Sequence, residues 1–429
     1  MTTPKPLAQP PTSSSLTVLV PKSIFVFPID LVTRGRLTAM PIEETSSRRS
    51  RRSFLQLSTA AAAAMVGMRI VTEPVLARAY SQPFPKDAVM IDANENPLGP
   101  CAAARDALNG VLPQAGRYLF WMTEDLIDTF AATEGLKPEY IRAFPGSSYP
   151  LHYAVLAFTS PSKSYVMADP GYEAGAHAAR FSGARVIRIP LTKTYSHDVR
   201  AMLTAAPDAG LFYICLPNNP TGTLTSHSDI EFLLEKKSKD SVLLVDEAYI
   251  HLSDASSVLD LVKADKDLIV LRTFSKIYGM AGLRCGFAIG KPELLAKIEM
   301  FSGWNPMPIT ALAAAIASLK DPRLLAERKQ INAAVREATF EWLAKNRYSY
   351  IASQSNCFMV DAKRPTKEVI SALAAQNVFV GRPWPVWPTH IRVTVGTQAE
   401  MERFQAAFER VMASPINAKF YPSQETSPE

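Results

Sequence analysis

Short hydrophobic runs alternate with longer amphipathic stretches between about residues 101 and 300. The short runs are rich in β-branched or aromatic residues and are bounded by Pro, Gly, Asp or Asn, as buried strands are. The stretches between them have the spacing of helices with one apolar face. The pattern predicts strands over Ser164–Ala168, Ala184–Ile189, Gly210–Leu216, Ser241–Val245, Leu268–Arg272 and Cys285–Gly290, and helices over Leu151–Thr159, Gly171–Phe181, Ser226–Lys237 and Pro292–Met300.

This alternation indicates βαβ units, and so an α/β fold whose large domain has a mostly parallel central sheet. After residue 300 the pattern changes and predicts a smaller α+β domain. Its expected helices are Ala311–Leu319, Leu324–Ala344 and Gln398–Met412, and its expected strands are Ser349–Val360, Val378–Val380 and His390–Val395. We expect an N-terminal arm and part of the small domain over 80–115, the large domain over 116–300, the small domain over 301–416 and a flexible tail over 417–429.

The first 79 residues have the parts of an export signal. Ser50-Arg51-Arg52-Ser53-Phe54-Leu55-Gln56 is followed by an apolar run over 57–71 and by Ala77-Arg78-Ala79. A paired arginine, an apolar region and an A-x-A site are typical of a twin-arginine signal of bacteria. The alternative is a membrane anchor, which the Ala-rich composition and Arg69 disfavour. We expect removal of 1–79, with Met40 as an alternative start, and a periplasmic or otherwise extracytoplasmic protein exported by the twin-arginine machinery.

Composition limits the function classes. The chain has 429 residues, of which 47% are hydrophobic and 20% charged, as in ordinary enzymes. Its net charge of +6 comes entirely from residues 1–79, which contain ten Lys and Arg and four Asp and Glu. Residues 80–429 contain 36 basic and 36 acidic residues and so have no net charge. There is therefore no electrostatic case for nucleic acid. The cysteines Cys101, Cys215, Cys285 and Cys357 form no C-x-x-C pair, and we expect neither a disulfide framework nor a metal site.

The segment from Arg272 to Arg284 follows a predicted strand and combines two hydroxyls, a lysine and an arginine. The hydroxyls of Thr273 and Ser275 together with the Arg284 guanidinium have the chemistry of a phosphate site. Lys276 beside them is a candidate amine for Schiff-base chemistry, since lysine forms imines with carbonyl groups. By itself a Ser-Lys pair is more often a feature of a protein surface.

Two other predicted strands end in polar side chains. Asn219 precedes a proline, which keeps it out of the helical region and lets its amide project into a site. Asp246 directly follows the strand predicted over Ser241–Val245, where a carboxylate can pair with a protonated ring nitrogen, and Tyr249 comes three residues later. Each feature alone fits a turn or a helix cap. Because ligands bind at the carboxyl ends of parallel strands, we expect these residues to share one site.

The order and spacing of Asn219, Asp246, Tyr249, Lys276 and Arg284 resemble the fold-type I pyridoxal-phosphate aminotransferases of class I/II, in particular the histidinol-phosphate aminotransferase branch. The resemblance starts at Asp92-Ala93-Asn94-Glu95-Asn96-Pro97-Leu98-Gly99-Pro100 and ends at Arg392-Val393-Thr394-Val395-Gly396-Thr397. It covers nearly the whole chain after residue 79. It implies the fold of that family and pyridoxal 5′-phosphate as cofactor.

The resemblance also implies roles for individual residues. Lys276 would hold the cofactor as a Schiff base and move a proton, Asp246 would bind the ring nitrogen, and Asn219 and Tyr249 the ring oxygen. Arg392 would bind the substrate α-carboxylate and Asn96 would line the substrate pocket. The other implied cofactor contacts are Thr273, Ser275 and Arg284 to the phosphate, Tyr172 stacked on the ring, and Tyr118 reaching the phosphate of the partner subunit's cofactor.

Two segments depart from the family pattern. In Gly146-Ser147-Ser148 a serine replaces the usual acidic residue, and we expect the Ser147 and Ser148 hydroxyls to contact the phosphate with the following helix N-terminus. The arginine that follows the strand Val378–Val380 is displaced by one, to Arg382. In a strand-like stretch this shift reverses the side chain's face, which weakens the case for a phosphorylated substrate. Trp384 and Trp387 beside it either line an apolar pocket or pack structurally.

The resulting prediction is an aminotransferase that moves an amino group between an amino acid, or a related primary amine, and a 2-oxo acid by a ping-pong mechanism. The Tyr118 role implies a homodimer. One alternative keeps the cofactor and changes the reaction to decarboxylation, elimination or racemisation. Another is a cofactor-binding protein without activity, which the complete residue set disfavours.

Overall fold

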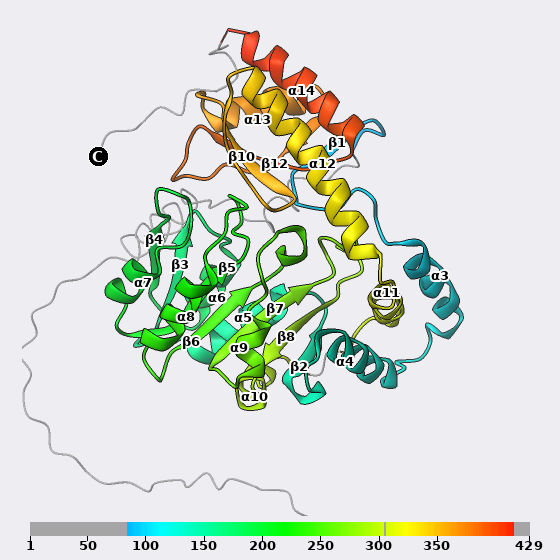
Figure 1. The fold of residues 1–429 in the computed structure, drawn as a ribbon, viewed down its shortest axis with the longest axis vertical. Coiled ribbons are helices and arrows are strands. Elements are labelled where there is room, and N and C mark those ends of the chain that lie inside the picture. Colours follow the sequence, from blue (N-terminus) through cyan, green and yellow to red (C-terminus); the bar gives the residue numbers. More distant parts are fainter. Residues whose placement is uncertain (1–83, 304–305, 416–429) are drawn as a thin grey trace, which may run out of the picture. The chain divides into compact units, whose positions relative to one another are not determined.

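The computed structural model describes residues 84–303 and 306–415 (Figure 1). The expected signal at 1–79 and the expected tail at 417–429 lie outside the described residues. Among the residues that are described, no helix is long and apolar enough to cross a membrane.

A seven-stranded sheet forms the centre of the large domain. Its strands lie in the order β2-β8-β7-β6-β5-β3-β4, with β4, β3, β5, β6 and β7 parallel and β8 antiparallel to both its neighbours. The α/β class and the mostly parallel sheet are therefore confirmed. The strands span β2 Ile141–Phe144, β3 Ser164–Asp169, β4 Val186–Pro190, β5 Ala209–Cys215, β6 Val242–Asp246, β7 Leu268–Thr273 and β8 Gly286–Gly290. All six predicted strands are present, and β2 is the one that the pattern missed.

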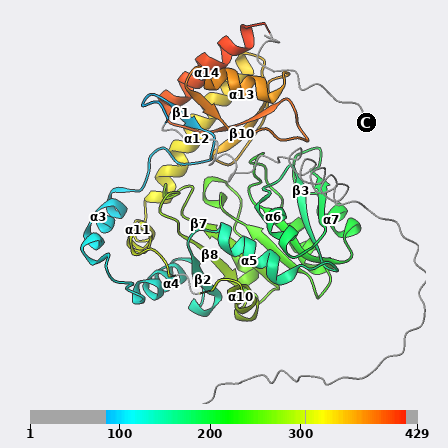
Figure 2. The ribbon, with the colours of Figure 1, turned by 180° about the vertical axis from the view of Figure 1, so that it is seen from behind.

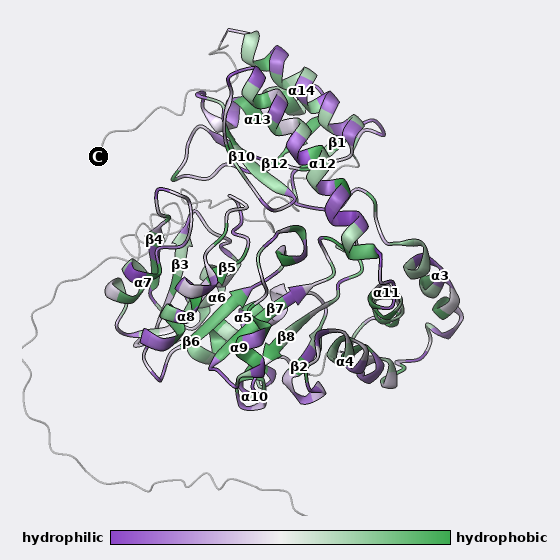
Figure 3. Ribbon diagram, viewed as in Figure 1, coloured by the Kyte–Doolittle hydropathy of each residue, from purple (hydrophilic) through white to green (hydrophobic). Residues whose placement is uncertain are grey.

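Strands β5 to β8 are buried along their whole length, which explains their continuous hydrophobic runs (Figure 3). Opposite views show helices on both faces of the sheet (Figures 1 and 2). The helices of this part are α3 Ala102–Val111, α4 Trp121–Glu134, α5 Ser148–Phe158, α6 Ala174–Phe181, α7 Val199–Ala205, α8 His227–Lys236, α9 Leu259–Lys263, α10 Pro292–Glu299 and α11 Ile309–Leu319, with 3-10 turns over Leu112–Gln114, Pro138–Tyr140 and Ile250–Leu252.

Helix α6 begins at Ala174, three residues later than predicted. Gly171 to Glu173 instead form the loop after β3, so that Tyr172 lies at the carboxyl edge of the sheet. Helix α8 begins as its sequence indicates, because the Ser226 hydroxyl accepts a hydrogen bond from the Asp229 amide at 3.1 Å. Local capping therefore determines the first residue of α8, whereas the later start of α6 leaves a loop after β3 that can contribute to a site.

The small domain contains a three-stranded antiparallel sheet, β12-β10-β9, and a parallel pair, β1-β11. The single strand predicted over Ser349–Val360 is wrong, because a turn divides it into β9 and β10. The Ser353 hydroxyl holds this turn by donating to the Cys357 carbonyl at 2.5 Å. The elements are β1 Val89–Ile91, β9 Ser349–Ile351, β10 Cys357–Asp361, β11 Val378–Val380, β12 His390–Thr394, α12 Leu324–Lys345, α13 Thr366–Ala374 and α14 Gln398–Ala413.

Two hydrophobic clusters divide these elements. The larger one includes Cys101 to Val111 and also α11, which packs against α3 and α4. The smaller one joins β1 to the elements after residue 335. The expected boundaries at 115/116 and 300/301 do not coincide with this division: α3 and α11 belong to the large cluster, and α12 starts in the large cluster and ends in the small one.

Candidate active site

A cavity lies at the carboxyl ends of β3, β5, β6 and β7 and brings together residues from distant parts of the sequence. Ten of the residues that line it were predicted from the sequence: Ser147, Ser148, Tyr172, Asn219, Asp246, Tyr249, Thr273, Ser275, Lys276 and Arg284. Leu151, Cys215 and Ala248 complete the lining. The residues meet because parallel strands present their carboxyl ends at one edge.

One end of the cavity is built from hydroxyls and a guanidinium. Arg284 Nη1 donates to Ser275 Oγ at 3.2 Å, and Nη2 donates to Ser148 Oγ at 3.4 Å. Thr273 Oγ1 donates to Ser275 Oγ at 2.9 Å and accepts from the Ser275 amide at 3.1 Å. This group contains donors and a cation but no carboxylate among the cavity residues around it, which suits a phosphate.

Gly146 shapes the same end of the cavity. Its φ is +91°, and a Cβ at this position would lie 2.1 Å from Arg284 Nη2. Only glycine therefore allows the guanidinium to lie against the backbone that leads into α5. Helix α5 starts two residues later, so its first amides face the same region, where a helix N-terminus favours an anion.

Asp246 lies elsewhere in the cavity and is 4% exposed. Its Oδ2 accepts a hydrogen bond from Tyr213 Oη at 2.9 Å, and its Oδ1 accepts one from the Ala248 amide at 3.2 Å. Burial raises the pKa of Asp246 to about 6, although these hydrogen bonds and the Lys276 charge oppose the shift. A cationic partner in the cavity would stabilise the ionised carboxylate.

Tyr249 is bound by two amides. Its hydroxyl accepts from Asn94 Nδ2 at 3.0 Å and from Asn219 Nδ2 at 3.4 Å. Burial raises the pKa of Tyr249 well above its usual value, so the phenol stays protonated and can donate into the cavity. Lys276 Nζ lies 5.5 Å from the Tyr249 ring centre and donates to the Ala93 carbonyl at 3.3 Å.

Arg392 connects the small domain to this cluster. It lies on β12, is 1% exposed, and donates through Nη1 to Asn219 Oδ1 at 2.9 Å and through Nη2 to the Asp92 carbonyl at 2.5 Å. Its buried Nε has no hydrogen-bond partner among the described residues. The guanidinium thus retains a donor for a carboxylate.

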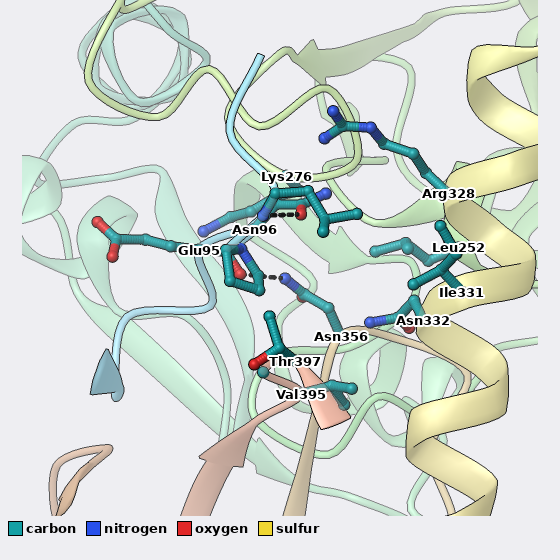
Figure 4. A pocket seen from close by; sticks show the side chains of 13 residues that line it. Glu95, Asn96, Leu252, Lys276, Arg328, Ile331, Asn332, Asn356, Val395 and Thr397 are labelled. Atoms are coloured by element: carbon teal, nitrogen blue, oxygen red, sulfur yellow. Dashed lines mark hydrogen bonds between the residues drawn. The ribbon is translucent and has the colours of Figure 1, made fainter. Parts of the chain in front are cut away.

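Asn96 lies in a second cavity, which shares Lys276 with the first (Figure 4). Asn96 Nδ2 donates to the Ile277 carbonyl at 3.0 Å, and Asn356 of the small domain donates to the carbonyl of the preceding residue, Glu95, at 3.2 Å. Residues of α12 close this cavity, including Arg328 and Asn332. The structure therefore places Asn96 beside the lysine and outside the cavity that holds Asp246.

Arg392 itself lines neither cavity and reaches the first one through Asn219, whereas Tyr118 is not brought to the site by the single chain. Tyr118 lies between α3 and α4, is 57% exposed, and stacks on Phe120 with ring centres 5.3 Å apart. It lines neither of these two cavities.

Sequence reasoning missed Asn94, Tyr213 and Glu173. Asn94 stands within the motif Asp92–Pro100, two residues before the asparagine that was singled out. Tyr213 lies inside β5, where a buried tyrosine gives no local signal that its hydroxyl reaches a carboxylate. Glu173 directly follows Tyr172, and its partner comes from the small domain.

Comparison with known proteins agrees with this geometry. The family "Aminotransferase class I and II" matches residues 86–408. The chain is similar to a histidinol-phosphate aminotransferase of Moorella thermoacetica, 31% identical over 335 residues, covering 76% of this chain and 86% of the relative. It is equally similar to an aromatic amino acid aminotransferase of Cutibacterium acnes, 31% identical over 324 residues, covering 74% and 91%. Among solved structures, histidinol-phosphate aminotransferase of Sinorhizobium meliloti in complex with pyridoxal-5′-phosphate shares the fold, with a TM-score of 0.71, 22% identity and coverage of 86% and 98%.

The chain belongs to the class I and II aminotransferase family. The predictions of this fold, of a pyridoxal-phosphate-dependent aminotransferase and of its cofactor are confirmed. The residues present fit that cofactor, because one cavity offers a phosphate site around Arg284, a buried carboxylate at Asp246 and a lysine amine at Lys276. Among the described residues, no group of His, Cys, Asp and Glu is arranged to hold a metal ion.

Proposed function

We propose that this aminotransferase moves the amino group of an α-amino acid, held by Arg392, to a 2-oxo acid held in the same way. The observation that carries this proposal is the position of Arg392, whose guanidinium is hydrogen-bonded to Asn219 of the cofactor cavity and whose buried Nε has no hydrogen-bond partner among the described residues. Amino acids and 2-oxo acids share an α-carboxylate, and a guanidinium binds that group with two parallel hydrogen bonds.

Each of the ten predicted residues of the cavity has a proposed task. Arg284, Ser275, Thr273, Ser147 and Ser148 bind the cofactor phosphate, and Tyr172 packs on its ring. Asp246 binds the ring nitrogen, and Tyr249 and Asn219 the ring oxygen. Lys276 Nζ holds the cofactor between turnovers and carries the proton to and from the substrate Cα. Bound pyridoxal phosphate supplies an electron sink for the negative charge that develops at Cα.

The direct test is a single-turnover assay on the purified chain loaded with pyridoxal phosphate. Addition of individual amino acids should convert the cofactor to its amine form, and a 2-oxo acid should reverse the spectral change. A cofactor spectrum that amino acids change without reversal by any 2-oxo acid would indicate a decarboxylase, lyase or racemase. The Lys276→Ala variant is the control and should show no turnover.

The proposal includes a homodimer in which Tyr118 reaches the cofactor phosphate of the partner subunit. The exposure of Tyr118 in the single chain and its stacking with Phe120 support this role, because aromatic side chains so exposed are common at interfaces.

The proposal also includes export by the twin-arginine pathway, which rests on residues 50–79 alone. The route would carry the protein folded, with its cofactor loaded, and an extracytoplasmic enzyme would not serve histidine biosynthesis. The test is to express the full chain in a bacterium and to compare it with the Arg51→Lys/Arg52→Lys variant by fractionation. Export that persists in that variant, or in a strain without the twin-arginine translocase, would contradict the proposal.

A further inference from the structure

A buried ion pair lies beside the proposed carboxylate site. Arg382 Nη2 donates to Glu173 Oε2, and the two side chains are 2% and 14% exposed. The residues are 209 positions apart, since Arg382 follows β11 in the small domain and Glu173 belongs to the loop after β3 in the large domain. The pair therefore joins the small domain to the loop of the large domain that carries Tyr172.

Both members of the pair are neighbours of proposed site residues. Glu173 directly follows Tyr172, which lines the cofactor cavity. Arg382 directly follows Gly381, whose amide donates to the Arg392 carbonyl at 2.8 Å and whose Cβ, if present, would lie 3.0 Å from Arg392 Nε. The ion pair thus lies next to the guanidinium that would hold the substrate, close enough for the Arg392 charge to act on Glu173.

The charges of this region are balanced through Glu173. Burial raises the pKa of Glu173, while the charge and hydrogen bond of Arg382 and the charge of Arg392 hold it down. The pair of Glu173 and Arg382 is neutral when both are ionised, so that Arg392 remains as the net positive charge beside the cavity. One carboxylate of a substrate satisfies that charge.

The surroundings of Arg382 fix it in place. Its guanidinium carbon lies 3.6 Å from the centre of the Trp384 ring. Trp384 is 1% exposed and packs with Ile351 and Met359 in a separate small cluster. Of the two alternatives for Trp384, the structure therefore supports structural packing, with the ring serving as a platform for Arg382.

We propose that the Glu173–Arg382 pair determines substrate specificity by keeping Arg382 from binding an anionic side chain, so that the enzyme selects amino acids with uncharged side chains over phosphorylated or dicarboxylic ones. A second anionic group would meet the Glu173 carboxylate and would have to displace it from Arg382. Replacing one partner of a buried ion pair in this way is costly, because the displaced charge stays buried. This inference rests on the proposed function, since it concerns the side chain of a substrate that Arg392 holds.

The test compares kcat/KM for L-phenylalanine with that for L-aspartate and O-phospho-L-serine, in the wild type and three variants. The wild type should prefer phenylalanine. In Glu173→Gln the carboxylate that competes for Arg382 is removed, and the ratio of anionic to neutral kcat/KM should rise roughly tenfold or more. In Arg382→Gln the Glu173 carboxylate remains alone, and the ratio should fall. In Glu173→Gln/Arg382→Gln the region is neutral again, and the ratio should return close to that of the wild type.

The readouts separate the two proposals. If no amino acid converts the cofactor in the wild type, the proposed function fails before the ion pair is examined. If phenylalanine is converted but the ratio is the same in all four proteins, or if the wild type already prefers aspartate or phosphoserine, the specificity role is wrong. Should Glu173→Gln fail to fold or to bind cofactor, the other two variants still decide the question. Arg382→Gln must lower the ratio of anionic to neutral kcat/KM, and the double variant must restore it.

Discussion

Arg392 of the small-domain sheet donates a 2.9 Å hydrogen bond to Asn219, which follows β5 of the central sheet. The side-chain amide of Asn219 also donates to Tyr249 Oη at 3.4 Å. One asparagine thereby connects the proposed carboxylate site to the proposed cofactor site. We therefore expect the position of the substrate relative to the cofactor to depend on this contact.

The first prediction concerns Arg392. Arg392→Lys removes the planar pair of donors that a carboxylate needs and leaves Asn219 Oδ1 without its guanidinium partner. We expect kcat/KM for amino acids to fall roughly 30- to 1,000-fold, which corresponds to a loss of about 2–4 kcal/mol in transition-state binding. Any slow turnover of 2-phenylethylamine, which lacks the carboxylate, should change little.

A matched control for this prediction is Arg364→Lys. Arg364 lies before α13 and donates to the carbonyls of Val411, at 2.6 Å, and Ser414, at 3.3 Å, and none of these three residues lines a cavity that contains Lys276. Its replacement should leave the kinetics unchanged. Equal losses for amino acids and 2-phenylethylamine in Arg392→Lys would point to a structural role for Arg392.

The second prediction concerns Asp246 in the cofactor-free protein. Its pKa is about 6 in the folded state and near 3.8 unfolded, because burial disfavours the charge. As the pH rises from 3.8 to about 6, Asp246 loses its proton in the unfolded chain before it does so in the folded protein. The folded state is therefore destabilised progressively across this pH range, and the destabilisation persists at higher pH. Asp246→Asn should therefore stabilise the cofactor-free protein by roughly 1–3 kcal/mol above about pH 6 and not below about pH 4.

This prediction is checked by urea unfolding of both proteins at several pH values. The same variant should lose most transamination activity, because an amide cannot pair ionically with a protonated ring nitrogen. If the difference in unfolding free energy between variant and wild type did not depend on pH, burial of the ionised Asp246 carboxylate would not destabilise the folded protein. Comparing the variant with the wild type cancels the contributions of all other titrating groups.

The sequence located the strand ends of the site well, and physical reasons explain this. Asn219, Asp246 and Thr273 follow or end buried parallel strands, whose hydrophobic runs are visible locally and whose carboxyl ends meet at one edge. Strand β2 was missed because it is short and contains Arg142, which breaks the hydrophobic run. The strand predicted over Ser349–Val360 was too long, since residue type alone did not reveal the turn at Ser353.

The partners of the site residues were not predictable from local pattern. Tyr213 reaches Asp246 because the register of β5 and β6 pairs Cys215 with Asp246, which places Tyr213 diagonally across from it. Glu173 and Arg382 meet only when the small domain is in place. Such contacts depend on register and domain packing, which a single sequence does not encode in any short segment.

The third prediction concerns the phosphate site. Gly146→Ala places a Cβ where Arg284 Nη2 lies, at 2.1 Å, and does so at a φ of +91° that alanine disfavours. The guanidinium has to move away from Ser148 and Ser275. We expect cofactor affinity to fall at least about tenfold, since a charge-assisted hydrogen bond contributes roughly 1.5–3 kcal/mol. Titration of the cofactor-free protein with pyridoxal phosphate measures this.

Gly110→Ala is the control for that experiment. Gly110 lies in α3, and a Cβ there would meet nothing within 4 Å. Alanine favours the helix by up to about 1 kcal/mol over glycine, so this variant should bind the cofactor normally and unfold at slightly higher temperature. If Gly146→Ala also bound the cofactor normally, the phosphate site would not depend on Arg284 in the position described.

The fourth prediction tests whether Tyr118 acts on a partner subunit. Tyr118→Phe should weaken cofactor binding if its hydroxyl reaches the phosphate of the neighbouring site, although Tyr118 lies outside the cavity of its own chain. Lys276→Ala should be inactive. In a hybrid of the two variants, the two defects fall in the same site when Tyr118 acts across the interface, because the site of the Lys276→Ala subunit receives the substituted position 118 of the other subunit.

The hybrid outcome depends on geometry in a way that single variants do not. If Tyr118 acts in trans, one hybrid site carries both substitutions and the other has the native Lys276 and Tyr118, so half of the sites regain full cofactor affinity at low pyridoxal phosphate. If Tyr118 acts within its own chain, each hybrid site has one defect and no such recovery occurs. Analytical ultracentrifugation of the wild type gives the independent check, since a fully active monomer excludes the trans arrangement.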